Sequence, residues 1–279
     1  MKQQTFKLVF ILFPFFLGCG NEKPNSENEE SIKAIQTEIP LSVKEMITEP
    51  EILNSNLAKV FNPDSIVGEE QMIKRSVLGF IGSNFQRFEI HFTSFEKSKT
   101  DNRTYFLKGK TRVKNNICNF TGELKISNIE IGKDSIRLLD EMEYSKNHTL
   151  ITITSKIIIK ESPNEKHSGY IEGTLSTSAF ADSTNEIHYN SLEFFSDGFI
   201  NNAFEGKWIK YNSTETKICN WGDFRIPKSG DLDIGAGEFS INDKYLKNGW
   251  ETYRLQFYVE PNSKEMINAQ IRENDKWWE

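Results

Sequence analysis

The sequence is poor in the residues that most often carry catalysis or bind metals. Its 279 residues include three cysteines and four histidines. The histidines lie far apart and outside any short motif, at His91, His148, His167 and His188. The sequence contains no His-Glu-x-x-His, no Gly-x-Ser-x-Gly and no phosphate-binding glycine loop, and no pair of histidines accompanies the cysteines as a zinc site would require. These absences argue against an enzyme, and we predict no catalytic residue, no metal ligand and no cofactor.

Positive charge is also in short supply. Lys and Arg number 34 against 40 Asp and Glu, a formal net charge of −6. Removal of residues 1–18, which include Lys2 and Lys7, would leave −6 − 2 = −8. Because nucleic-acid binding depends on Lys and Arg that neutralise phosphates, we expect no nucleic-acid partner.

The sequence lacks an apolar run long enough to cross a bilayer, which takes about 20 residues. The uncharged run at residues 8–17 is about half that length and follows Lys2 and Lys7. The run leads into the sequence Phe-Leu-Gly-Cys at residues 16–19, which ends on Cys19. This order of a basic, an apolar and a small-residue segment predicts a secretory signal peptide over residues 1–18.

The site around Cys19 resembles the lipobox of bacterial lipoproteins. The resemblance implies cleavage before Cys19, diacylglycerol on its thiol and a further acyl chain, such as palmitate, on the new N-terminus. Two or more acyl chains hold a soluble domain on a membrane stably. The expected location is therefore a bacterial membrane, the outer membrane, with the membrane itself as a partner. The alternative is a simple secretory signal with an incidental cysteine.

Residues 20–31 hold no aromatic or aliphatic side chain, and four Glu stand against one Lys. Such a segment cannot bury enough surface to offset the entropy of ordering, so we predict a disordered lipidated tether over residues 19–31. Glu27, Glu29 and Glu30 resemble the acidic patch of surface-exported lipoproteins of Bacteroidetes; a plain linker is the alternative, and the periplasmic or surface face stays open. Residues 32–62, interrupted by Pro40 and Pro50, are predicted to be an irregular lead-in.

Residues 63–279 are predicted to form a single β-rich domain. Its first element is expected to be an amphipathic helix near residues 68–82, because apolar side chains recur there at helical spacing. From residue 86 the period changes to two, which is typical of strands with one polar face. Such strands favour an antiparallel curved sheet, a barrel or a sandwich, over a parallel sheet buried on both faces. The alternating segments lie at residues 88–92, 105–113, 120–126, 151–159 and 253–259.

Three glycines occupy the inward positions of predicted strands, each between apolar residues two places away: Gly122, Gly173 and Gly206. A missing side chain at such a position lets a sheet bend or a large neighbour cross it. We predict these glycines to be curvature points.

Cys118 and Cys219 stand in matching contexts, Ile-Cys-Asn-Phe and Ile-Cys-Asn-Trp. An even number of cysteines in a secreted chain suggests a disulfide between them. The alternative is a pair of buried free thiols that act as small apolar residues.

The stretch at residues 204–251 holds three of the five tryptophans and a cluster of Asp and Gly. Exposed Trp beside Asp and Asn is typical of sugar-binding sites, although Trp is equally ordinary in a core. A carboxylate is expected to pair with the arginine and fix the loop. The candidate ligand-binding residues are Trp208, Trp221, Arg225, Asp231, Asp233 and Trp250.

Asp231, Asp233 and Glu238 alternate with glycines and could wrap a calcium ion through oxygen ligands. The segment does not follow the EF-hand template, since Gly235 and Ala236 fill its fifth and sixth places. The alternative is a turn region in which Asp accepts backbone hydrogen bonds.

The same stretch carries a family resemblance. Residues 219–227 (CNWGDFRIP), 230–239 (GDLDIGAGEF) and 244–250 (KYLKNGW) look like a block found in uncharacterised lipoproteins of Bacteroidetes. The likeness covers roughly residues 60–255. It implies an envelope address and one domain, and it implies no activity.

Three functions remain open. The first is a lipid-anchored binding or interaction module of the bacterial envelope, with a glycan or envelope protein contacted by residues 204–250. The second is an envelope glycan-active enzyme, which would need two carboxylates about 5–10 Å apart across a cleft, drawn from Asp223, Asp231, Asp233 and Glu238. The third is a structural assembly protein whose partner contacts Trp277 and Trp278.

Overall fold

The computed structural model describes residues 46–63, 66–67, 72–73, 77–132, 148–194, 196–257 and 259–279. The chain divides into two compact units, and the second, Glu45–Glu279, holds all the described residues. The predicted signal peptide, Cys19 and the tether lie outside them. Within the described residues, no helix is both long enough and apolar enough to cross a membrane.

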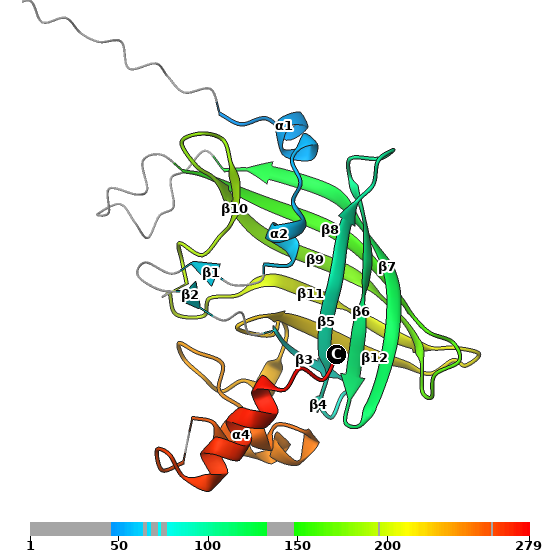
Figure 1. Ribbon diagram of the computed structural model, residues 1–279, viewed down its shortest axis with the longest axis vertical. Helices are drawn as coiled ribbons and strands as arrows, with labels where there is room; N and C mark the ends of the chain where they lie inside the picture. Colours follow the sequence, from blue (N-terminus) through cyan, green and yellow to red (C-terminus); the bar gives the residue numbers. More distant parts are fainter. Residues whose placement is uncertain are drawn as a thin grey trace, which may run out of the picture. The chain divides into compact units, whose positions relative to one another are not determined.

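The described residues form one large antiparallel sheet that curls into a half-barrel (Figure 1). This confirms the prediction of a mainly β chain with an antiparallel curved sheet. The strand order is β4-β3-β12-β11-β9-β8-β7-β6-β5, and β10 pairs with β9. The strands are β3 (Val77–Ile81), β4 (Gln86–Arg87), β5 (Glu89–Lys97), β6 (Thr104–Val113), β7 (Asn116–Ile131), β8 (Thr149–Glu161), β9 (Gly169–Ala181), β10 (Ile187–Tyr189), β11 (Asn201–Lys210) and β12 (Thr216–Asp223). A separate ribbon joins β1 (Ile66–Val67) and β2 (Met72–Ile73).

The two edge strands of the sheet, β4 and β5, are joined by a single residue, Phe88. β4 pairs with β3, and β5, which begins at Glu89, pairs with β6. Between them the Phe88 amide donates to the Gly79 carbonyl oxygen at 2.9 Å. The chain segment 86–97 therefore contacts both edges of the sheet and draws them together.

The concave side of the sheet carries the main core. The inward positions of β8 show why this strand forms, because alternate isoleucines from Ile151 to Ile159 are buried while their neighbours face outward. Two short helices, α1 (Glu49–Asn54) and α2 (Ala58–Phe61), lie on the same side and complete the core (Figure 1). The Leu57 amide donates to the Tyr105 hydroxyl at 3.0 Å. Residues 46–62, predicted to be irregular, are therefore folded, because Ile52, Leu57 and Phe61 cover the open side of the sheet.

The helix predicted near residues 68–82 is wrong. Residues 72–73 form β2 and residues 77–81 form β3. β3 is buried on both faces: Ile81 joins the main core, and Leu78 and Phe80 join a second cluster. A strand covered on both sides reads as an almost continuous apolar run, and such a run cannot be told from a buried helix by its spacing.

A large neighbour crosses two of the three glycines, Gly173 and Gly206, whereas their role as curvature points stays a prediction. Gly173 and Gly206 lie opposite each other on β9 and β11. A Cβ atom at either one would stand 2.5 Å from the Phe204 ring. That ring stacks on Trp221 with centroids 3.6 Å apart. The two glycines therefore leave room for an aromatic pair in the core.

A strand was expected at residues 253–259, but residues 253–255 are helical and residues 256–257 form a turn. The C-terminal segment contains η3 (Gly230–Leu232), η4 (Asp243–Asn248), α3 (Glu251–Leu255) and α4 (Lys264–Asn274). Trp250 and Tyr253, three residues apart, both contact Phe239. This helical spacing places them on the second core cluster, formed by Leu78, Phe80, Ile226, Leu232, Phe239, Ile241 and Trp250.

The disulfide between Cys118 and Cys219 is absent, and both cysteines are free and buried. Cys118 lies on β7 and Cys219 on β12, and three strands, β8, β9 and β11, separate them in the sheet. Similar local contexts say nothing of spatial proximity, so the alternative of two buried thiols holds.

Candidate functional site

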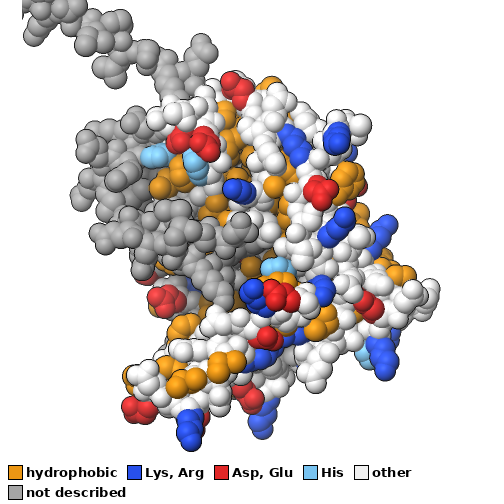
Figure 2. Space-filling view, viewed as in Figure 1, with side chains coloured by type: hydrophobic (Ala, Val, Ile, Leu, Met, Phe, Trp, Pro, Cys, Tyr) orange, Lys and Arg blue, Asp and Glu red, His pale blue; other side chains and the backbone are white. Residues whose placement is uncertain are grey.

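A groove of about 1230 Å³ opens beside the point where the sheet edges meet. One wall consists of β3, β4 and the start of β5. The opposite wall consists of residues 253–257 and 273–278, and the segments at residues 194, 196–199 and 224–240 close it on a third side. Figure 2 shows positive and negative side chains interspersed on one face of the molecule, with hydrophobic side chains between them and a row of hydrophobic side chains at the lower left.

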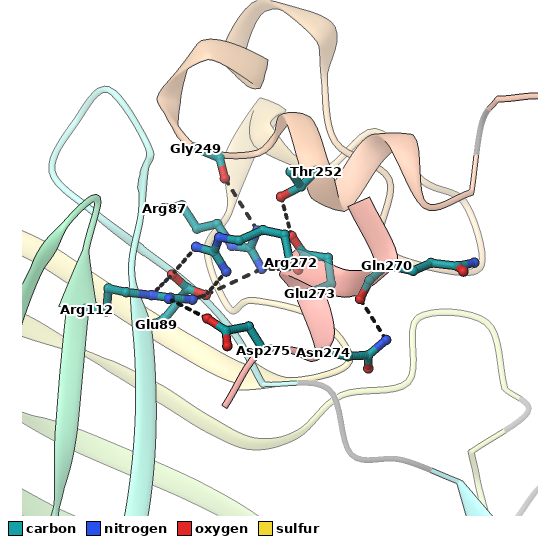
Figure 3. A network of polar contacts seen from close by, with 10 residues as sticks. All are labelled: Arg87, Glu89, Arg112, Gly249, Thr252, Gln270, Arg272, Glu273, Asn274 and Asp275. Carbon is teal, nitrogen blue, oxygen red and sulfur yellow. Dashed lines mark hydrogen bonds and ion pairs between the residues drawn. The ribbon is translucent and has the colours of Figure 1, made fainter. Parts of the chain in front are cut away.

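A buried ion pair joins the two walls. Arg87 of β4 donates from Nη1 and Nη2 to the two carboxylate oxygens of Glu273 of α4, at 2.7 and 2.5 Å (Figure 3). The Thr252 hydroxyl also donates to Glu273. Burial acts to raise the pKa of Glu273, but the hydrogen bonds and charge of Arg87 outweigh it, so its pKa is lowered. Bidentate geometry of this kind fixes orientation as well as charge.

Glu89, on the first position of β5, lies among three arginines (Figure 3). It accepts from Arg112 at 2.7 and 2.5 Å and from Arg272 at 3.4 and 3.2 Å, and Arg87 lies 3.9 Å away. Burial acts to raise the pKa of Glu89, but the hydrogen bond from Arg112 and the charge of Arg87 lower it overall. Asp275 lies 3.9 Å from Arg112, so the network sets three arginines against three carboxylates and their charges balance.

The last residues of the chain extend this contact with rings. Trp277 lies over the Arg112 guanidinium at 4.5 Å, and Trp278 stacks on His91 with centroids 3.8 Å apart and planes 9° from parallel. Both Trp side chains are half-buried and line the groove. The pair that was expected to contact a partner therefore contacts its own chain with part of its surface.

The groove also has a cluster of apolar side chains. Phe194, Phe199 and Phe224 contact one another with centroids 4.9 to 5.8 Å apart. Ile234 and Phe257 line the same groove and are 59% and 60% exposed. Apolar side chains this exposed in a concave surface are typical of a binding site.

Arg225 holds the third side in place. Its Nε donates to Asp233 Oδ2 at 2.8 Å, and its other nitrogens donate to the carbonyls of residues 235, 236 and 237. Asp233 Oδ1 accepts from the amides of Gly235 and Ser240. The predicted pairing of Arg225 with a carboxylate is confirmed, and these two residues shape the loop that lines the groove.

The three candidate tryptophans lie in the core. Trp208 donates from Nε1 to Glu161 at 3.0 Å, Trp221 stacks on Phe204, and Trp250 donates to the Phe85 carbonyl at 2.9 Å. None of the three lines the groove. They are too large and apolar to remain at the surface of a sheet that offers them a core.

The calcium alternative finds no support in the geometry. Both oxygens of Asp233 accept hydrogen bonds from the loop and from Arg225, and Asp231 binds Lys244 and the Tyr245 hydroxyl. Within the described residues, the group of carboxylate and imidazole atoms that come within 4.8 Å of one another is Asp182, Glu186 and His188. In this group, Asp182 accepts hydrogen bonds from Thr184, Glu186 and His188. The group is therefore explained as a turn held together by its own hydrogen bonds.

The carboxylates proposed for an enzyme do not face one another across the groove. Asp223 is fully buried and accepts from Tyr189 and Asn202. Asp231 and Asp233 are occupied by their own neighbours, and of the four only Glu238 lines the groove.

Sequence reasoning missed the groove's charged residues. Arg87 and Glu273 are 186 residues apart, so no local pattern links them. Their one visible signal is the alternation in which Arg87, Glu89 and His91 share the polar face of a strand.

Comparison with known proteins adds little. No family model matches the chain, and the search of solved structures found no match. A stretch of 94 residues, 32% of this chain, is 26% identical to the toxin CdiA of Escherichia coli. The chain spans about 3% of the length of that protein, and a match so short and distant carries no argument about function.

Proposed function

We propose that this protein is a lipid-anchored module of the bacterial envelope that binds a glycan in the groove beside residues 224–240. The observation that carries the proposal is the groove itself, which is lined by the exposed Phe257 ring, the half-buried Trp277 and Trp278, and several oxygen-bearing side chains. The volume of the groove, about 1230 Å³, is above the upper end of about 1,000 Å³ for typical ligand pockets, as suits an extended ligand.

The chemistry of the walls favours a sugar. Phe257 offers an exposed ring to the apolar side of a pyranose, and Trp277 and Trp278, which each contact their own chain on one side, add indole surface to the same groove. Asp197, Glu238 and Asn274 line the same groove and can accept or donate to hydroxyls. Because Arg87 and the other arginines already pair with carboxylates, the groove presents little uncompensated positive charge, which suits a polyol better than a phosphate.

The envelope address rests on the sequence around Cys19 and on the acidic residues that follow it. The intact mass of the membrane-extracted protein tests it. A chain that begins at Cys19 and carries acyl groups supports the anchor, whereas an unmodified secreted mass overturns it. Protease treatment of whole cells then separates a surface face, where the chain is degraded, from a periplasmic face, where it is protected.

Binding is tested by titrating the full chain with soluble fragments of envelope glycans and following its NMR spectrum. Phe257→Ala and Trp278→Ala should each weaken binding several-fold, because each removes one ring face. Ile158→Ala, which truncates an exposed apolar residue of β8 outside the groove, is the matched control. Glycan binding that is unchanged in both ring variants, or absent throughout the panel, contradicts the proposal.

A further inference from the structure

A second pocket, of about 680 Å³, lies at the end of the half-barrel where four strand-connecting turns come together. The turns are β3–β4, β6–β7, β8–β9 and β11–β12, and they contribute Ser83, Lys114, His167 and Glu215 to its rim. The pocket shares no lining residue with the groove beside residues 224–240. It is therefore a separate site, and a ligand bound there is independent of the proposed glycan.

The floor of the pocket combines buried apolar side chains with two neutral polar residues, Gln86 and Thr111, and one carboxylate. Ile81, Phe88 and Trp208 are buried there. Glu161 is 5% exposed and occupies the inward position that follows Ile157 and Ile159 on β8. A carboxylate at such a position is costly unless its charge is compensated.

The compensation within the chain is incomplete. Thr111 donates to Glu161 Oε1 at 2.5 Å, and the Gly169 amide and Trp208 Nε1 donate to Oε2 at 2.8 and 3.0 Å. All three donors are neutral, and no described Lys, Arg or His forms an ion pair with this carboxylate. Oε1 keeps a second lone pair, since a carboxylate can accept about four hydrogen bonds.

The neighbouring indole is already used to hold an ammonium group. Lys217 Nζ lies 5.4 Å from the centre of the Trp208 ring, whose N–H binds Glu161. Lys217 itself pairs with Glu215 at the rim, at 2.8 Å. An indole face beside a carboxylate is a surface that favours a cation.

We infer that this pocket binds a primary ammonium group carried on a short apolar chain. The ammonium group lies against Glu161 Oε1, and the apolar chain packs on Phe88 and Ile81. The volume suits a ligand of this class. A carboxylate ligand at the same depth would meet the charge of Glu161, although Lys114, Lys210 and Lys217 also line the pocket.

The test compares three ligands that share one chain: hexylammonium, hexanol and hexanoate. The full-length protein is titrated with each, and the indole N–H resonance of Trp208, assigned with Trp208→Phe, reports binding at the site. Hexylammonium should move this resonance with an affinity about tenfold above that of hexanol, and hexanoate should leave it in place. Equal affinity for hexylammonium and either of the other two overturns the inference.

Glu161→Gln removes the charge and keeps the shape. The glutamine oxygen can still accept from Gly169 and Trp208, and its amide can donate to the Thr111 hydroxyl, so the fold is retained. Hexylammonium affinity should fall about tenfold to a hundredfold. Glu215→Gln removes the same charge from the rim and should change affinity less than about threefold, since an exposed charge is well screened. Equal losses in the two variants overturn the inference, and if Glu161→Gln fails to fold, the comparison of the three head groups on the natural sequence still decides.

Discussion

Arg87 and Glu273 form a two-pronged ion pair between a two-residue strand at the edge of the sheet and the last helix of the chain, with N–O distances of 2.7 and 2.5 Å. Each of the two side chains is 9% exposed. The pair therefore ties the C-terminal segment to the place where the sheet edges meet, and it forms the base of the groove.

Breaking this pair from one side should detach α4. Glu273→Gln or Arg87→Met leaves one buried charge without its partner, which costs about 3–5 kcal/mol, whereas the double variant should lose less than the sum. Urea unfolding measures the stability, and amide hydrogen exchange of residues 264–274 locates the effect. Lys276→Met, which removes an exposed pair with Glu279, is the control and should change neither. Additive losses in the double variant would show that the two side chains do not act as a unit.

Acid should act on the same contact. The pKa values of Glu89 and Glu273 are lowered in the folded chain by the arginines around them. A carboxylate with a lowered folded pKa contributes stability above its unfolded value, about 4.3, and loses it as pH falls through the folded value. We expect hydrogen exchange in α4 to accelerate below about pH 4, before the sheet unfolds. Glu273→Gln should flatten part of this pH dependence, and an identical acid profile would contradict the assignment.

Much of the sheet could be predicted from the sequence, and the site could not. The alternation of apolar and polar residues along β8 is a local signal, and it predicted that strand. The spacing of apolar residues around Gly206 is another local signal, and it predicted the close approach there. The pairing of Arg225 with Asp233 was accessible because the two lie eight residues apart. β3 was mistaken for a helix because both its faces are covered, and the residues near Tyr253 were mistaken for a strand because a short apolar run fits either period. The Arg87–Glu273 pair depends on folding of the whole chain, so no window of sequence contains it.

The close approach at Gly206 gives a stability prediction. Gly206→Ala would place a methyl group 2.5 Å from the Phe204 ring, and that ring cannot retreat because it stacks on Trp221. Overpacking of this kind costs about 1–3 kcal/mol. Thr174→Ala, on the neighbouring strand and the opposite face, should cost less than about 0.5 kcal/mol. Thermal unfolding of both variants distinguishes a steric effect at Gly206 from a general sensitivity of these strands.

The two thiols should be inert while the chain is folded. Burial, with the negative charges of Glu161 and Glu165, raises the pKa of Cys118 to about 12, and burial and Glu161 raise the pKa of Cys219 well above its usual range. The thiolate is the reactive form, so alkylation by iodoacetamide at about pH 8 should be slow in the folded chain and rapid in urea. Mass spectrometry should find both thiols free in protein taken from the envelope. A mass lower by two hydrogens, restored by reduction, would instead establish the disulfide that the matching sequence contexts suggest.

The loop that lines the groove depends on Arg225, which makes a contact that lysine cannot reproduce. Its planar fork donates to Asp233 and to three successive carbonyls at once, whereas an ammonium group reaches one or two of these. Arg225→Lys should therefore loosen residues 233–240 without unfolding the sheet, since the loop contributes little to the main core. Limited proteolysis should show faster cleavage in this loop, and affinity for a ligand of the groove should fall with it. Asp231→Asn is the control because Asp231 lies in the same stretch and its carboxylate pairs with Lys244 and Tyr245 at the surface. Similar protection of the loop in Arg225→Lys and Asp231→Asn would show that the backbone holds it without the guanidinium.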